Sequence, residues 1–215
     1  MTSRRLTVGL GAVLSLLVLA GACSSGSSTG SGATSSTNGA PSTTTTTAAS
    51  AVDPNAPETN AAGDIPDNQV FVSYTAPSGD YSLKVPEGWA RTEAAGVVTF
   101  TDKLNSIRME TTAASAAPTV ASASQNEVPA IKAASTNYEA GKVTQVTRKG
   151  GAAVLITYRA DGPADPVTGR RTHNDVERYE FWKNGSEVIL TLSGPQGADN
   201  VDPWKIVTDS FAFLR

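Results

Sequence analysis

The sequence predicts an α+β domain in which an antiparallel β-sheet packs against two or so helices. Two observations support this fold class. Short runs of alternating apolar and polar residues, separated by turn-forming residues, recur over much of the chain after about residue 68, and this pattern is typical of antiparallel hairpins. Two further segments, one in the middle and one at the end, have apolar residues at helical spacing. Such helices would cover one or both faces of the sheet.

The first strands are predicted at the start of this region. QVFVSYT, residues 69–75, and YSLKVP, residues 81–86, both alternate between apolar and polar side chains, and the PSGD segment between them has the composition of a tight turn. GVVTFTD, residues 96–102, and NSIRMETT, residues 105–112, predict a second antiparallel pair. The domain therefore opens with hairpins.

The first helix is predicted over SQNEVPAIKAASTNYEA, residues 124–140. Ser124 and Glu127 have the spacing of a capping box at its start. Its apolar face would consist of Val128, Ile131, Ala134 and Tyr138.

Two long hairpins follow. KVTQVTRKGGAAVLITYRA, residues 142–160, has β-branched runs on both sides of Gly150-Gly151. DVERYEFW and SEVILTL flank Asn184-Gly185, and this dipeptide is among the strongest short hairpin signals.

A short helix ends the chain. Asp202 can cap it, and Pro203 fits the first helical position. The side chains of Trp204, Val207 and Phe211 then share one face, which we expect to pack on the sheet.

The composition excludes several functional classes. The chain of 215 residues has a formal net charge of −3, and without a basic excess we expect no nucleic-acid partner. Cys23 is the only cysteine and His173 the only histidine, so an intrachain disulfide, a thiolate cluster and a His-rich metal site are all impossible within one chain. We predict no metal and no cofactor.

Residues 1–22 have the pattern of a signal peptide. Arg4 and Arg5 precede LTVGLGAVLSLLVLA, an uncharged apolar stretch that is shorter than the ~20 residues needed to span a bilayer. The arginine pair leaves both the general secretory route and the twin-arginine route open. The general route is favoured because no bulky aromatic residue follows the pair.

The segment LAGAC, residues 19–23, resembles the lipobox of bacterial lipoproteins. This resemblance implies cleavage between Ala22 and Cys23 and a thioether-linked diacylglycerol on Cys23. Two acyl chains would give stable anchoring where one chain would be marginal. The alternative is an ordinary secreted protein in which Cys23 is incidental.

Residues 23–67 predict the lipidated cysteine followed by a disordered tether. The tether is rich in Ser, Thr, Gly, Ala, Pro and Asn, and its only large aliphatic residues are Val52 and Ile65, so it cannot bury enough apolar surface to offset its ordering entropy. Its stretch PSTTTTTAAS fits either an unmodified linker or an O-glycosylated stalk. Residues 68–215 would then form one domain.

The domain also resembles a known fold. YSLKVPEGW near its start, a helix in the middle, two long hairpins, and LTLSGP and WKIVTDSFAF at the end resemble the PsbP-like fold. More narrowly, they resemble actinobacterial lipoproteins of the LpqN and LpqT type. The resemblance covers Tyr74 to Phe213. It implies a sheet backed by helices and a mostly non-enzymatic role in binding a partner or ligand.

A candidate site lies in ADGPADPVTGRRTHND, residues 160–175, which is long for a hairpin connection. Arg170, Arg171 and His173 could bind an anionic group there; the alternative is a solvated surface loop. A serine hydrolase would need His173 as its base, but the chain has no Gly-x-Ser-x-Gly motif.

The sequence therefore predicts a non-enzymatic binding module, anchored by lipid on Cys23 at the extracytoplasmic face of the cell membrane. Its partner would be an envelope protein or an envelope glycan or lipid. The alternative is a lipid or small-molecule carrier with a pocket between sheet and helix, and a hydrolase is a third possibility.

The lipid anchor can be tested directly. We expect Cys23→Ala to move the protein from the membrane fraction to the soluble or secreted fraction, because the thiol that accepts the lipid is lost. Fractionation and detergent partitioning would measure this. Unchanged partitioning of the variant into detergent would refute lipidation.

Overall fold

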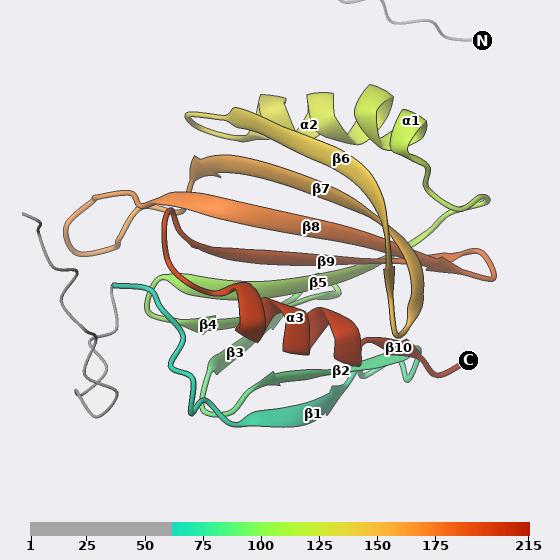
Figure 1. The fold of residues 1–215 in the computed structure, drawn as a ribbon, viewed down its shortest axis with the longest axis horizontal. Helices are drawn as coiled ribbons and strands as arrows, with labels where there is room; N and C mark the ends of the chain where they lie inside the picture. Colours follow the sequence, from blue (N-terminus) through green and yellow to red (C-terminus); the bar gives the residue numbers. More distant parts are fainter. Residues whose placement is uncertain (1–61) are drawn as a thin grey trace, which may run out of the picture. The chain divides into compact units, whose positions relative to one another are not determined.

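The computed structural model of the protein describes residues 62–215 (Figure 1). The predicted signal peptide, the predicted cleavage site between Ala22 and Cys23, and the tether up to residue 61 lie outside the described residues. No helix in the described part of the chain is long and apolar enough to cross a membrane.

A small antiparallel sheet contains three strands in the order β1-β2-β10. They are β1 (Phe71–Thr75), β2 (Tyr81–Pro86) and β10 (Ala212–Phe213). The first two are the strands predicted at the start of the domain, and they pair across a turn in which Gly79 has a φ of +71°. The last strand brings the C-terminal end of the chain to the other side of β2.

The large sheet contains seven strands in the order β3-β4-β5-β9-β8-β7-β6, and every pair is antiparallel. The strands are β3 (Ala90–Ala94), β4 (Val97–Asp102), β5 (Asn105–Ala113), β6 (Glu139–Arg148), β7 (Gly151–Asp161), β8 (His173–Lys183) and β9 (Ser186–Pro195). The predicted pairs β4–β5, β6–β7 and β8–β9 are confirmed. In the last turn Asn184 and Gly185 both have positive φ, at 50° and 85°, as a type I′ turn requires. The α+β class with antiparallel sheets is confirmed.

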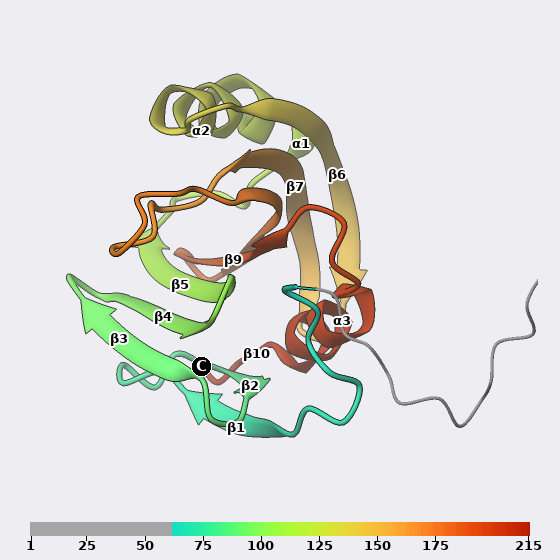
Figure 2. The same ribbon diagram turned by 90° about the vertical axis from the view of Figure 1, so that its left-hand side faces the viewer.

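Helical segments lie on both sides of the large sheet. Figure 2 shows α1 (Val120–Ser122) and α2 (Val128–Ala134) over one side of the curved sheet, and α3 (Val201–Ser210) with the small sheet on the opposite side. The main core lies between the two sheets and α3. A smaller cluster, containing Ala123, Val154 and Ile156, lies under α1 and α2.

Phe211 joins the parts of the main core. It follows the last residue of α3 and is 1% exposed. Its ring lies 4.1 Å from that of Phe181 in the large sheet and 5.8 Å from that of Tyr81 in the small sheet. Trp204 and Val207 are buried on the same side of the helix, so the predicted apolar face of the last helix is confirmed.

The first helix starts earlier than predicted and is not a regular α-helix. Its capping box is formed by Thr119 and Ser122, not by Ser124 and Glu127, and residues Ala123–Glu127 form a π-helical turn, η1, between α1 and α2. The helix ends at Ala134, so Tyr138 lies outside it. Val128 and Ile131 pack toward the sheet as predicted, whereas Ala134 is exposed.

The π-helical turn places a carboxylate over the sheet. Glu127 contacts Arg178 of β8 at 3.4 Å. The guanidinium of Arg178 also contacts Glu180 at 3.1 Å and Glu110 at 3.4 Å. Burial raises the pKa of Glu180, although the nearby Arg178 opposes the shift. This cluster joins the helical layer to two strands.

The start of α3 also differs from the prediction. Asn200, not Asp202, is the N-cap residue, and Pro203 is the third helical residue, not the first. The Asn200 side chain makes no capping hydrogen bond, because its atoms are used elsewhere: Oδ1 accepts a hydrogen bond from the Ile65 amide at 2.8 Å, and Nδ2 donates to the carbonyl of Gly63 at 3.1 Å. Asp202 remains in the first turn, where a negative charge is favourable.

Residues 62–67 pack against the domain, although the sequence predicts that they belong to the tether. Ile65 is 4% exposed and belongs to the main core. Gly63 lies so close to the ring of Pro195 that a Cβ at this position would overlap it. The chain therefore enters the domain beside the end of β9 and the start of α3.

Removal of the Phe211 ring should be strongly destabilising. We expect Phe211→Ala to lower the free energy of unfolding by about 3–5 kcal/mol, because a large ring is lost at the junction of both sheets and α3. Urea unfolding would measure the change. Val167→Ala, at a residue 89% exposed, is the control and should stay within about 0.5 kcal/mol of the parent. A loss below 1 kcal/mol for Phe211→Ala would contradict the packing described here.

Candidate functional site

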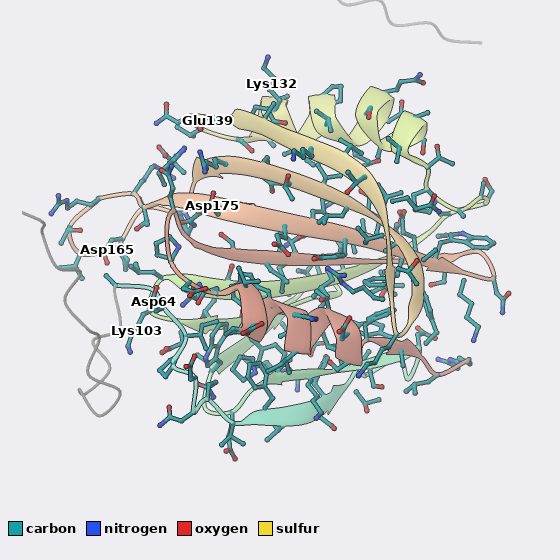
Figure 3. All side chains as sticks on the ribbon, viewed as in Figure 1. Asp64, Lys103, Lys132, Glu139, Asp165 and Asp175 are labelled. Carbon is teal, nitrogen blue, oxygen red and sulfur yellow. The ribbon has the colours of Figure 1, made fainter. Side chains whose placement is uncertain are left out.

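A groove of about 460 Å³ opens between the N-terminal end of α3 and the adjoining ends of four strands, β6 to β9. We call it the α3 groove. Its charged and aromatic lining consists of Glu139, Tyr158, Arg159, Asp175, Glu177 and Trp204, and Asn200 lies at its helical side. Figure 3 shows Glu139 and Asp175 at the same end of the large sheet.

Strand register brings the charged residues of the α3 groove together. Glu139 on β6 lies opposite Arg159 on β7, and Arg159 lies opposite Asp175 on β8. Residues directly opposite one another in neighbouring strands share a face of the sheet. These side chains therefore form a row across three strands, although they are far apart in the sequence.

Arg159 is held between two carboxylates. Its Nε donates to Oδ1 of Asp175 at 2.6 Å, and its Nη1 lies 3.6 Å from Oε2 of Glu139. The hydrogen bond and charge of Asp175, with a smaller contribution from Glu139, raise the pKa of Arg159. Asp175 also accepts a hydrogen bond from the amide of Gly197 at 3.2 Å, so both of its oxygens are engaged.

Glu177 follows Asp175 by two residues on β8, and it has a different environment. Its Oε2 accepts a hydrogen bond from the hydroxyl of Tyr179 at 2.8 Å, and that hydroxyl accepts one from Nη2 of Arg148 at 2.9 Å. Burial, assisted by the charge of Glu177, raises the pKa of Tyr179 to about 12. The phenol therefore stays protonated at neutral pH and holds the Glu177 carboxylate through a neutral donor.

A β-bulge shapes the open side of the α3 groove. The register between β6 and β7 shifts between Ala140 and Val143. At this shift a Cβ on Gly141 would overlap the carbonyl oxygen of Thr157, and the amide of Lys142 donates to Oγ1 of Thr157 at 2.9 Å. Bulges are common beside functional sites because they redirect an edge strand. Here the bulge lies on the last strand of the sheet.

The predicted loop residues have different partners. Arg171 donates from Nη1 to the carbonyl of Gly162 at 2.7 Å, and the main-chain oxygen of Arg170 accepts from the amide of Asp165 at 2.8 Å. His173 begins β8 and faces two carboxylates. Within residues 62–215, no hydrogen bond or ion pair joins the side chains of Arg170, Arg171 and His173 to one another.

The imidazole of His173 pairs with acids. Nδ1 lies 2.9 Å from Oδ1 of Asp161, and Nε2 lies 3.6 Å from Oε1 of Glu139. Within residues 62–215 no serine or threonine hydroxyl is hydrogen-bonded to this ring, so the described residues form no nucleophile–base pair there. The same residues contain no group of three or more His, Cys, Asp or Glu side chains placed to hold a metal ion.

Arg171 also lines a second, smaller hollow on the other face of the sheet. This hollow, of about 280 Å³, lies beside the C-terminal end of α2. Asn174 and Thr191 line it, and Oδ1 of Asn174 and Oγ1 of Thr191 are buried without a hydrogen-bond partner in the described residues. Buried polar atoms of this kind are commonly satisfied by ordered water.

Comparisons with known proteins give no family assignment. No protein-family model matches the chain, and no curated protein matches it either. Among solved structures, PsbP from the cyanobacterium Synechocystis sp. PCC 6803 is similar to this chain, with 16% identity, a TM-score of 0.47, and coverage of 70% of this chain and 98% of that one. The Ran-binding protein Mog1p from Saccharomyces cerevisiae has 10% identity and a TM-score of 0.46, with coverage of 68% and 96%.

A protein from Bacteroides thetaiotaomicron is also similar, with 12% identity and a TM-score of 0.46 over 66% of this chain. This chain spans only 48% of the length of that protein. All three TM-scores lie below 0.5. The proposals that follow therefore rest on the residues of this chain alone.

The pair formed by Asp161 and His173 should make stability depend on pH. The hydrogen bond from His173, with a further one from Asn137, lowers the pKa of Asp161. A carboxyl with a lowered pKa in the folded state stabilises the fold above its ordinary pKa of about 3.9, and this contribution is lost as the pH falls through the lowered value. Asp161→Asn should therefore lower the free energy of unfolding at pH 6. The difference in this free energy between variant and parent should become smaller as the pH approaches 3. Urea unfolding of both proteins between pH 6 and pH 3 would measure this difference. A difference that does not change with pH would contradict the lowered pKa of Asp161.

Proposed function

We propose that this protein is a non-enzymatic binding module of the cell envelope, held at the extracytoplasmic face of the membrane by lipid on Cys23. We propose further that it engages a partner protein at the α3 groove. The observation that carries the second proposal is the groove itself, an open hollow of about 460 Å³ with convergent charged groups and a tryptophan in its wall. Hollows of this size with a few placed polar groups are typical binding sites.

The surroundings of the α3 groove support a protein partner. Val201 lines the groove at the first turn of α3 and is 70% exposed. Exposed apolar residues beside a polar hollow are typical of interaction surfaces. Trp204 forms part of the wall but is only 7% exposed, because most of its ring belongs to the main core.

A carrier of alkyl chains fits this geometry less well. The α3 groove lies between sheet and helix, where a carrier would hold its cargo, but four charged side chains line it, and burying them against an alkyl chain would be costly. The space between α2 and the sheet is occupied by Val128, Ile131, Val154 and Ile156. Neither of these two places offers the apolar volume that a carrier needs. A third hollow, of about 890 Å³ between α3 and β2, is lined by Lys84, Lys149 and Lys205 as well as by apolar residues.

The entry of the chain supports a role at a tethered surface. The main chain of Gly63 and of Ile65 is hydrogen-bonded to the side chain of Asn200, which lines the α3 groove. A partner bound in the groove would therefore lie next to the point at which the predicted tether joins the domain.

Site-specific photo-crosslinking in cells would test the site. We expect a photoreactive amino acid at Val201 to capture a defined envelope protein that the same group at Val167, in the 162–172 loop between β7 and β8, does not capture. Ala198→Trp should abolish this capture by filling the groove, because Ala198 lines it. Ala133→Trp on the exposed side of α2 is the matched control and should leave capture intact. Equal capture from both positions, or capture that survives Ala198→Trp, would refute the site.

A further inference from the structure

We infer that the α3 groove binds the cationic side chain of a lysine or arginine carried on an extended segment of the partner protein. This inference rests on the proposed function, and it specifies the chemistry that the groove recognises. It rests on three observations: the charge of the lining, the partners of each charged group, and the position of the groove at the edge strand β6.

The lining has an excess of negative charge. Glu139, Asp175 and Glu177 are negatively charged and Arg159 is positively charged, so the charged side chains of the groove carry a net charge of −2. The described residues as a whole are close to neutral for their size, with 15 basic and 18 acidic residues over 62–215. The groove therefore holds much of the net negative charge of this part of the chain, and it would favour a positively charged ligand.

The excess charge is not neutralised inside the groove. Arg159 is already engaged by Asp175 at 2.6 Å and faces Glu139 at 3.6 Å. Glu177 takes part in none of the ion pairs formed within residues 62–215, and its hydrogen-bond donor is the neutral hydroxyl of Tyr179 at 2.8 Å. Glu177 thus presents an oriented carboxylate that no cation contacts directly within residues 62–215, since Arg148 reaches it only through the Tyr179 hydroxyl.

The uncharged part of the lining suits the stem of a long basic side chain. Pro195, Val201 and Trp204 all line the groove. Lysine and arginine bury their aliphatic stems on apolar surface while the charged head reaches a polar partner. A side chain that passes Trp204 and ends at Glu177 would use both kinds of wall.

The strand edge explains why the ligand would be an extended segment. β6 is the last strand in the order of the large sheet, and its residues 139–141 line the groove. Extended peptides bind at free strand edges, where main-chain hydrogen bonds supply affinity and side-chain pockets supply specificity. The bulge at Ala140 to Val143 leaves the pairing of β6 irregular at this point. A segment beside β6 could place one side chain in the groove.

The predicted tether of the chain itself is a poor occupant. Residues 24–61 contain no lysine or arginine and carry the acids Asp53 and Glu58. Such a segment would meet like charge in the groove, which is unfavourable. The cation must therefore come from another molecule.

A charge-matched peptide pair would test the inference on the full chain in detergent. The probe is the capped peptide acetyl-Gly-Val-Arg-Val-Gly-amide, and the control is the same peptide with citrulline, a neutral isostere, in place of arginine. We expect the arginine peptide to shift the amide NMR signals of Gly141 and Gly194. It should bind about fivefold more weakly to Glu177→Gln, as expected for one partly exposed ion pair, and more weakly as salt is raised.

The variants are chosen to preserve the fold. Gln at position 177 keeps an acceptor for the Tyr179 hydroxyl, and Glu87→Gln, at an exposed turn residue, is the matched control and should bind like the parent. Equal binding of the citrulline peptide, an unchanged affinity of Glu177→Gln, or signal shifts confined to another surface would each overturn the inference. A shift of the same signals with protein concentration alone would also overturn it, in favour of a second copy of this chain.

Failure of this inference is distinguishable from failure of the proposed function. If crosslinking from Val201 is blocked by Ala198→Trp but the two peptides bind alike, the groove remains a partner site and only its cation preference is wrong. If Val201 captures no partner that Val167 fails to capture, the proposed site itself is wrong.

Discussion

The placement of α3 depends on one buried amide, the side chain of Asn200. This side chain is 4% exposed and binds Gly63, Ile65 and Asn105, which come from the entry of the domain and the start of β5. Its main-chain oxygen accepts the Trp204 amide that begins the helix. Because a buried amide left without partners is costly, these segments are ordered together. The helix, the chain entry and the wall of the α3 groove are therefore joined through one residue.

Local patterns predicted most of the fold. Alternating apolar residues and the Asn184-Gly185 turn correctly predicted the paired strands, because a half-buried hairpin imposes a period of two on its own sequence. Residues 90–94 were missed, because all five side chains of β3 are exposed and leave no apolar period. The start of the first helix was also missed, because a π-helical turn does not follow the 3.6-residue repeat on which the prediction relied.

The site could be predicted only in part, because strand pairing assembles it. Glu139, Arg159 and Asp175 are separated by 20 and 16 residues in the chain and meet through register alone. The long loop before β8 lies at the same end of the sheet as the α3 groove, where His173 lies 3.6 Å from Glu139. No local signal marked Asn200, since its partners lie 95 to 137 residues away.

The π-helical turn limits the insertions and deletions that the chain can tolerate in this region. Ala123 and Val128 both pack toward the sheet although they are five residues apart. In a regular α-helix, at about 100° per residue, such residues would point in different directions. Loss of one residue between them would restore regular winding, but it would also shorten the link to Glu127 and its contact with Arg178. Homologous chains should therefore vary in length around this turn less freely than in the loop that precedes β8.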